Sequence, residues 1–138
     1  MLDLHITGLQ HLGVPVTDIA RSKAFYTWLG FHESMVTTLH TGSGDIQVVM
    51  MQAGTFVLEL YQLPNNALVE ISTRNHGHVD HFALAVDDIQ QVFDAVKAAG
   101  LVPLEHAPVF LPFWDKGVYY FNIEGPDGEK VEFNQRVS

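Results

Sequence analysis

Two kinds of hydrophobic pattern alternate along this chain and predict where its elements lie. A short apolar run over residues 9–16 is typical of a buried strand, and apolar residues at helical spacing follow over 19–29. Thr17 or Asp18 is placed to cap that helix, and Gly30 to end it. Three runs rich in β-forming residues then predict strands over 31–39, 46–52 and 55–63. The apolar stripe that we expect the helix to pack into the core consists of Ile19, Phe25, Trp28 and Leu29.

The second half of the chain shows the same succession. A strand is predicted over 79–86 and a helix over 88–99, with Gly100 as its stop. The polar stretch 64–76 between the halves is interpreted as an irregular linker. The apolar face of the second helix consists of Ile89, Val92, Phe93 and Val96. Beyond that helix, the pattern predicts an aromatic loop over 110–117 and strands over 101–104, 118–123 and 130–135.

The two halves are copies of one sequence pattern. His81 follows His11 by 70 residues, and Gly100 follows Gly30 by the same interval. A constant offset over this span indicates an internal repeat, so each half is expected to form one βαβββ module. At this length we expect a single domain of residues 1–138, made of module one (about 5–63), the linker (64–76) and module two (77–138).

The ratio of helices to strands predicts the fold class. Two helices against about eight strands leave each module unable to cover its own sheet, and pairing the modules solves this. We therefore expect an α+β fold in which two tandem βαβββ modules form a curved mixed sheet around a metal-binding cavity, with the helices outside.

Composition narrows the classes of partner and chemistry. The formal net charge is −9, which argues against a nucleic-acid partner. No apolar run approaches the ~20 residues that span a bilayer, and the N-terminus has no signal-peptide pattern, so we expect a cytoplasmic protein without a membrane partner. Cysteine is absent, which excludes disulfides and thiolate ligands. Any metal must therefore be bound by nitrogen and oxygen atoms.

Four side chains stand out as candidate metal ligands. Glu59 and Glu132 each lie between apolar neighbours in the last strand of their module. Because strand residues alternate between two faces, both carboxylates are expected to point away from the helices, and the histidines His11 and His81 likewise. A carboxylate in such a place is costly unless it is paired, hydrogen-bonded or bound to metal.

These residues also fit roles without a metal. A strand histidine is often structural, and a strand glutamate often lies at a solvated edge. The recurrence of all four at repeat-equivalent positions favours a shared partner, which we expect to be one divalent ion: zinc, nickel, cobalt, manganese or iron(II).

With these motifs in place, the chain resembles the vicinal oxygen chelate superfamily, and within it the glyoxalase I-type proteins (lactoylglutathione lyases). The resemblance covers nearly the whole chain and is most specific in its last turn and strand. It rests on His11 with Asp18-Ile19 and Phe25-Tyr26, on Leu58-Glu59-Leu60, on Gly77-His78-Val79-Asp80-His81 with Asp87-Asp88-Ile89, and on Gly125-Pro126-Asp127-Gly128 with Val131-Glu132-Phe133.

The resemblance implies an activity and a ligand set. His11, Glu59, His81 and Glu132 match the four metal-ligand positions of the family. The implied reaction is the isomerisation of the hemithioacetal of a 2-oxoaldehyde through an enediolate, giving a lactoyl thioester. Glu132 is our first choice for the catalytic base, with Glu59 as its partner or rival. A homodimer is expected on the resemblance alone.

The substrate contacts are predicted from aromatic and basic residues. The aromatic residues Phe113, Trp114 and Tyr120 suggest an apolar lid, and Arg74 and Lys116 are candidate cations for a small acidic substrate. The sequence contains seven Lys and Arg residues in all, which is few for recognition of glutathione. Two alternatives stay open: another reaction of the superfamily (epimerase, dioxygenase or thiol transferase), and a non-catalytic protein of the bleomycin-resistance type that binds a small ligand.

Overall fold

The computed structural model describes residues 11–78, 81–111 and 116–138. The chain divides into two compact units, residues 1–71 and 72–138, and each is described by itself. None of the described helices is both long and apolar enough to cross a membrane.

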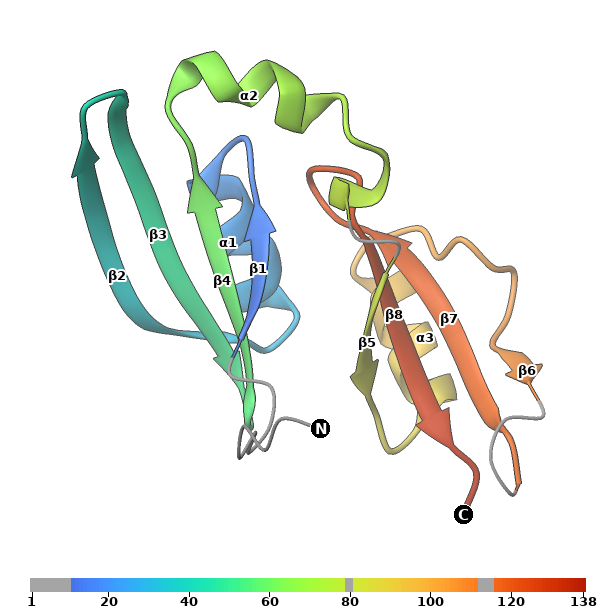
Figure 1. The fold of residues 1–138 in the computed structure, drawn as a ribbon. Coiled ribbons are helices and arrows are strands. Elements are labelled where there is room, and N and C mark those ends of the chain that lie inside the picture. Colours follow the sequence, from blue (N-terminus) through green and yellow to red (C-terminus); the bar gives the residue numbers. More distant parts are fainter. Residues whose placement is uncertain (1–10, 79–80, 112–115) are drawn as a thin grey trace, which may run out of the picture. The chain divides into compact units, whose positions relative to one another are not determined.

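The first unit is a four-stranded mixed sheet with one helix packed on it (Figure 1). Its strand order is β1-β4-β3-β2, with β1 parallel to β4 and the other neighbours antiparallel. Leu58 and Leu60 of β4 are fully buried and form the centre of the core with Tyr26 of α1. The elements are β1 (Leu12–Pro15), α1 (Ile19–Trp28), β2 (His32–Thr41), β3 (Gly44–Ala53), β4 (Phe56–Gln62) and α2 (Asn65–Ser72).

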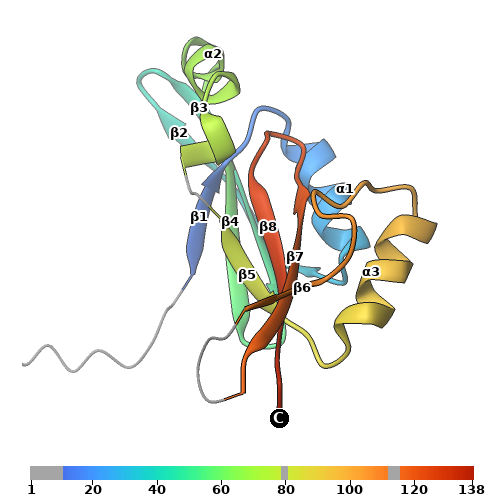
Figure 2. The same ribbon diagram turned by 90° about the vertical axis from the view of Figure 1, so that its right-hand side faces the viewer.

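The second unit repeats this plan. Its strand order is β5-β8-β7-β6, again with a parallel first pair, and Figure 2 shows α3 on one side of the strands. Phe93 of α3 packs edge-on against Phe121, which stacks on Phe133 of β8. The elements are the 3-10 helix η1 (Asn75–His78), β5 (Phe82–Ala85), α3 (Ile89–Ala98), β6 (Val109–Leu111), β7 (Val118–Glu124) and β8 (Lys130–Arg136).

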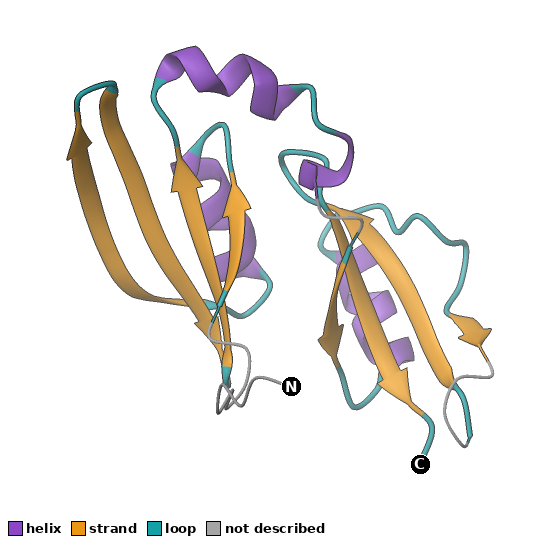
Figure 3. Cartoon of the chain, in the orientation of Figure 1, coloured by secondary structure: helices purple, strands orange, loops and turns teal. Residues whose placement is uncertain are grey.

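The order of elements confirms the predicted fold class. Each unit runs strand, helix and three further strands, so the chain is an α+β protein of two tandem βαβββ modules (Figure 3). The predicted face of the second helix is also confirmed, because Ile89, Phe93 and Val96 are buried.

The N-termini of α1 and α3 make equivalent hydrogen bonds. Asp18 and Asp88 each accept a hydrogen bond from the backbone N–H three residues later, at 3.0 and 2.9 Å. The side-chain oxygen of Gln62 accepts from the Ile19 N–H, and that of Gln135 accepts from the Ile89 N–H. Both glutamines lie at or next to the end of the last strand of their unit, so each helix is hydrogen-bonded directly to the strand that carries the candidate glutamate.

The predicted core stripe of the first helix was wrong in part. Ser22 and Tyr26 are its buried residues, whereas 48% of the Trp28 surface is exposed. Trp28 and Val36 line a pocket of about 620 Å³ between α1 and strands β2 and β3. The indole therefore borders a groove in the first unit and does not fill its core.

Three further local predictions were wrong. The stretch interpreted as an irregular linker contains α2, whose Ile71 side chain is buried. No strand forms over 101–104. The outer strand is β6, which overlaps the start of the segment predicted as an aromatic loop, and a long connection precedes it (Figure 3). The Leu104 N–H nevertheless donates to the Asn122 carbonyl oxygen, so this connection still runs along β7.

The N-cap of α3 gives a direct test of this account of the helix starts. Replacing Asp88 by alanine removes the acceptor for the Gln91 N–H, and we expect the free energy of unfolding to fall by about 1 kcal/mol. Asp88→Asn is the matched control, because asparagine caps helices about as well as aspartate. Urea denaturation followed by circular dichroism measures both; an alanine variant as stable as the wild type would contradict the assignment.

Candidate metal centre

Strand register places the first histidine beside the first glutamate. In the parallel pair of β1 and β4, Gly13 lies opposite Glu59, while Leu58 and Leu60 on either side are fully buried. Alternation along β4 therefore turns Glu59 to the face away from α1. His11 lies two residues before Gly13 and so belongs to the same face. Its Nε2 atom lies 2.8 Å from Oε2 of Glu59.

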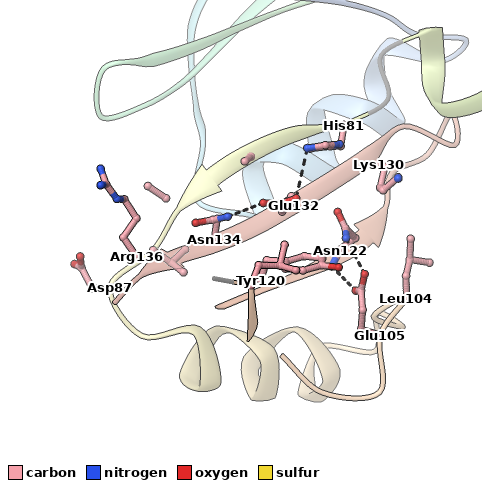
Figure 4. A pocket seen from close by; sticks show the side chains of 14 residues that line it. His81, Asp87, Leu104, Glu105, Tyr120, Asn122, Lys130, Glu132, Asn134 and Arg136 are labelled. Atoms are coloured by element: carbon pink, nitrogen blue, oxygen red, sulfur yellow. Dashed lines mark hydrogen bonds and ion pairs between the residues drawn. The ribbon is translucent and has the colours of Figure 1, made fainter. Parts of the chain in front are cut away.

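The second unit builds the same pair at the equivalent register. Ala83 of β5 lies opposite Glu132 of β8, and the neighbours Val131 and Phe133 are buried. His81 lies two residues before Ala83, and its Nε2 atom is 3.5 Å from Oε2 of Glu132 (Figure 4). The four predicted ligands thus form two His–Glu pairs, one in each unit.

The donor atoms of each pair suit a divalent metal. Metal–ligand distances of about 2.0–2.2 Å and angles of about 90–110° put neighbouring ligand atoms roughly 2.9–3.5 Å apart. The observed nitrogen–oxygen separations of 2.8 and 3.5 Å agree with this range within about 0.1 Å. Within the described part of either unit, no third His, Asp or Glu side chain joins the pair. Each pair alone therefore supplies half of a four-ligand set.

Glu132 lines a pocket of about 880 Å³ whose described lining comes entirely from the second unit (Figure 4). The volume lies within the range of small-molecule sites. On the same face of β8, Asn134 Nδ2 donates to Glu132 Oε1 at 2.7 Å. Only 13% of the Glu132 side chain is exposed, against 27% for Glu59. Glu132 is therefore the more enclosed of the two glutamates.

A second polar group borders the pocket next to Glu132. Asn122 of β7 lies directly opposite Glu132, and the Glu105 carboxylate accepts from both its backbone N–H and its Nδ2 atom, at 2.6 and 2.8 Å. These bonds orient the amide and leave its Oδ1 atom buried, with no partner among the described residues. An unmade hydrogen bond of this kind costs about 1–3 kcal/mol. A hydroxyl or N–H group that reached Oδ1 would remove this cost.

One of the predicted substrate-binding residues lines this pocket, and the others do not or are not described. Tyr120 lines the pocket, whereas Arg74 and Lys116 are not among its lining residues. Phe113 and Trp114 lie outside the described residues. Two other cations, Lys130 and Arg136, border the pocket from the Glu132 face of β8.

Sequence reasoning missed Asn134, Asn122 and Glu105. The period-two alternation along β8 puts Asn134 on the Glu132 face, so this residue was detectable once the strand was predicted. Asn122 depends on the register between β7 and β8, which has no local sequence signal. Glu105 lies in the connection before β6, where the predicted strand was wrong, and its contact with Asn122 is a tertiary one.

Comparison with known proteins bears on the family and the fold of the chain. The chain is 32% identical over 130 residues to the uncharacterized protein YwbC of Bacillus subtilis (strain 168), an alignment of 93% of this chain and 97% of that protein. Its fold is similar to that of a glyoxalase family protein from Enterococcus faecalis, with a TM-score of 0.73, 17% identity and coverage of 95% and 99% of the two chains. A glyoxalase family protein from Bacillus cereus gives a TM-score of 0.71 at 12% identity, with 100% and 99% covered.

These two solved structures support the fold alone, since their sequence identities are low. A family model gives the stronger result, because the model of the Glyoxalase/Bleomycin resistance protein/Dioxygenase superfamily matches residues 8–133. Since that match spans most of the sequence and the fold agrees, the chain belongs to the glyoxalase/bleomycin resistance protein/dioxygenase, or vicinal oxygen chelate, superfamily.

Proposed function

We propose that this protein is a glyoxalase I-like isomerase that depends on one divalent metal ion, held by His11, Glu59, His81 and Glu132. The observation that carries the proposal is the recurrence of a His–Glu pair at the same strand register in both units. Imidazole nitrogen and carboxylate oxygen together suit zinc, nickel, cobalt, manganese and iron(II).

The proposed substrate is the hemithioacetal of a 2-oxoaldehyde. A bound divalent metal would polarise the hydroxyl and carbonyl oxygens as a Lewis acid, which would acidify the proton on the carbon that carries the hydroxyl group and the sulfur. Glu132 takes that proton and returns it to the former carbonyl carbon, while the hydroxyl proton passes to the former carbonyl oxygen. The product is the thioester of a 2-hydroxy acid. No atom is gained or lost in this isomerisation.

Glu132 is favoured over Glu59 as the base by its position in the second unit. It lines the 880 Å³ pocket, and Glu59 does not. Asn122 also lines this pocket, and the cations Lys130 and Arg136 in its lining offer positive charge to an acidic end of the thiol. Tyr120 contributes an aromatic wall.

Metal content is the first test. Protein purified without chelators should hold about one divalent ion per chain, and the double variant Glu59→Ala/Glu132→Ala should lose it. The pair of His40 and Asp45 provides a matched control, because it has the same 2.8 Å contact on an exposed hairpin of the first unit alone. His40→Ala/Asp45→Ala should keep the metal. Absence of metal from the wild type, even after zinc or nickel is supplied, would contradict the proposal.

Activity is the second test. With methylglyoxal and a panel of thiols, the metal-loaded protein should form a 2-hydroxyacyl thioester, detected by its ultraviolet absorbance. Glu132→Gln keeps the shape of the side chain but cannot accept the proton, so kcat should fall by about 10²–10⁴-fold. A Glu132→Gln variant that turned over normally would exclude Glu132 as the base. A wild-type protein that binds metal but forms no thioester with any thiol would point to another reaction of the superfamily.

The same activity can test whether two subunits of the expected homodimer share the metal ligands. Variant one carries His11→Ala/Glu59→Ala and variant two carries His81→Ala/Glu132→Ala, so each lacks one pair. If the four ligands come from two subunits of a dimer, mixing the variants should restore about a quarter of wild-type activity, because half of the dimers are mixed and each has one intact site. Ligands drawn from a single chain would give no recovery.

A further inference from the structure

The two His–Glu pairs have equal positions but unequal surroundings. On the ligand face of β4, the residue after Glu59 is Tyr61, which lies opposite Pro15. On the ligand face of β8, the residue after Glu132 is Asn134, which lies opposite Ala85. Tyr61 and Asn134 are thus equivalent positions of the repeat.

Asn134 and Tyr61 differ in their contacts with the neighbouring glutamate. Asn134 donates to Glu132 Oε1 at 2.7 Å, while Oε2 of the same carboxylate faces His81 (Figure 4). Among the described residues, the Glu59 carboxylate has His11 as its hydrogen-bonding or ionic partner, and Tyr61 makes no hydrogen bond to it. Among the described residues, the second unit therefore has a donor to the glutamate oxygen that does not face the histidine, and the first unit has none.

The cross-strand neighbours show the same difference. Met50 of β3 lies opposite Glu59, and Asn122 of β7 lies opposite Glu132.

The direction of the bond between Asn134 and Glu132 follows from the carboxylate. An ionised carboxylate is purely an acceptor, so the Asn134 group that faces it must be the Nδ2 donor. A hydrogen bond from that donor to a charged oxygen is strong enough to restrain rotation of the carboxylate.

We propose that Asn134 is a positioning residue that makes Glu132 a single-oxygen ligand. It holds Oε1 and leaves Oε2, the atom that faces His81, for the metal. Glu59 has no such restraint in the described structure and keeps both oxygens available to the ion. The two glutamates of the repeat are therefore distinguished by Asn134 and Tyr61, and this inference rests on the proposed metal site.

Binding of Co²⁺ to the full chain tests this role, because the visible absorption of Co²⁺ reports its coordination. Two uncharged variants remove the donor: Asn134→Leu, which keeps nearly the branched shape of asparagine, and Asn134→Ala, which is smaller. Both should weaken Co²⁺ binding by about 10–100-fold, as loss of a hydrogen bond to a metal ligand typically does, and both should change the Co²⁺ spectrum. Tyr61→Phe is the matched control at the equivalent position and should change neither the affinity nor the spectrum.

The outcomes separate this inference from the proposed function. If the wild type does not bind Co²⁺, the metal site itself is wrong and the inference fails with it. If the wild type binds Co²⁺ and Asn134→Leu binds it with unchanged affinity and spectrum, the metal site stands and the role of Asn134 is overturned. A purely packing role for Asn134 predicts this second result, because leucine has nearly the same shape. Should Asn134→Leu fail to fold by circular dichroism, Asn134→Ala alone decides the question.

Discussion

The parallel pairing between the first and last strands of each unit is the constraint on which the candidate site depends. Parallel neighbours cannot be joined by a tight turn, so a helix and two strands intervene between them, and residues far apart in sequence become adjacent. This is how His11 meets Glu59 and how His81 meets Glu132. A register slip of one residue in β4 or β8 would turn the glutamate toward the helix and the leucine or phenylalanine toward solvent. Burial of those apolar neighbours therefore maintains the geometry of the pair.

Duplication explains why the two His–Glu pairs are alike and their surroundings differ. The helix caps, the helix-to-strand glutamine bonds and the His–Glu pairs recur in both units. The neighbours of the glutamates do not, since Tyr61 and Met50 stand where the second unit has Asn134 and Asn122. Two copies of one module thus keep the same His–Glu pair, while the second copy has polar neighbours around its glutamate. Membership in a superfamily that includes enzymes and binding proteins is consistent with such variation in the pocket.

Much of the fold could be predicted because its signals are local. Hydrophobic periodicity indicated α1, α3 and every described strand except β6, and Asp18, Asp88, Gly30 and Gly100 marked the ends of the helices. The 70-residue offset then related the halves, and period-two alternation assigned Glu59 and Glu132 to the faces that the structure shows. Each of these inferences uses only neighbours along the chain or the repeat itself.

Other features were decided by contacts between distant segments. Trp28 matched a helical stripe, but Tyr26 is the residue that points into the core. The apolar stretch 101–104 has strand-forming residues, yet the outer strand formed at 109–111, where pairing with β7 was available. The bonds of Glu105 to Asn122 and of Asn134 to Glu132 depend on which strands lie side by side. The sequence by itself therefore determined the repeat, the helix ends and the ligand candidates, because spacing along the chain encodes them. Only the tertiary structure decided the partners of those ligands, because cross-strand register has no signal in local sequence.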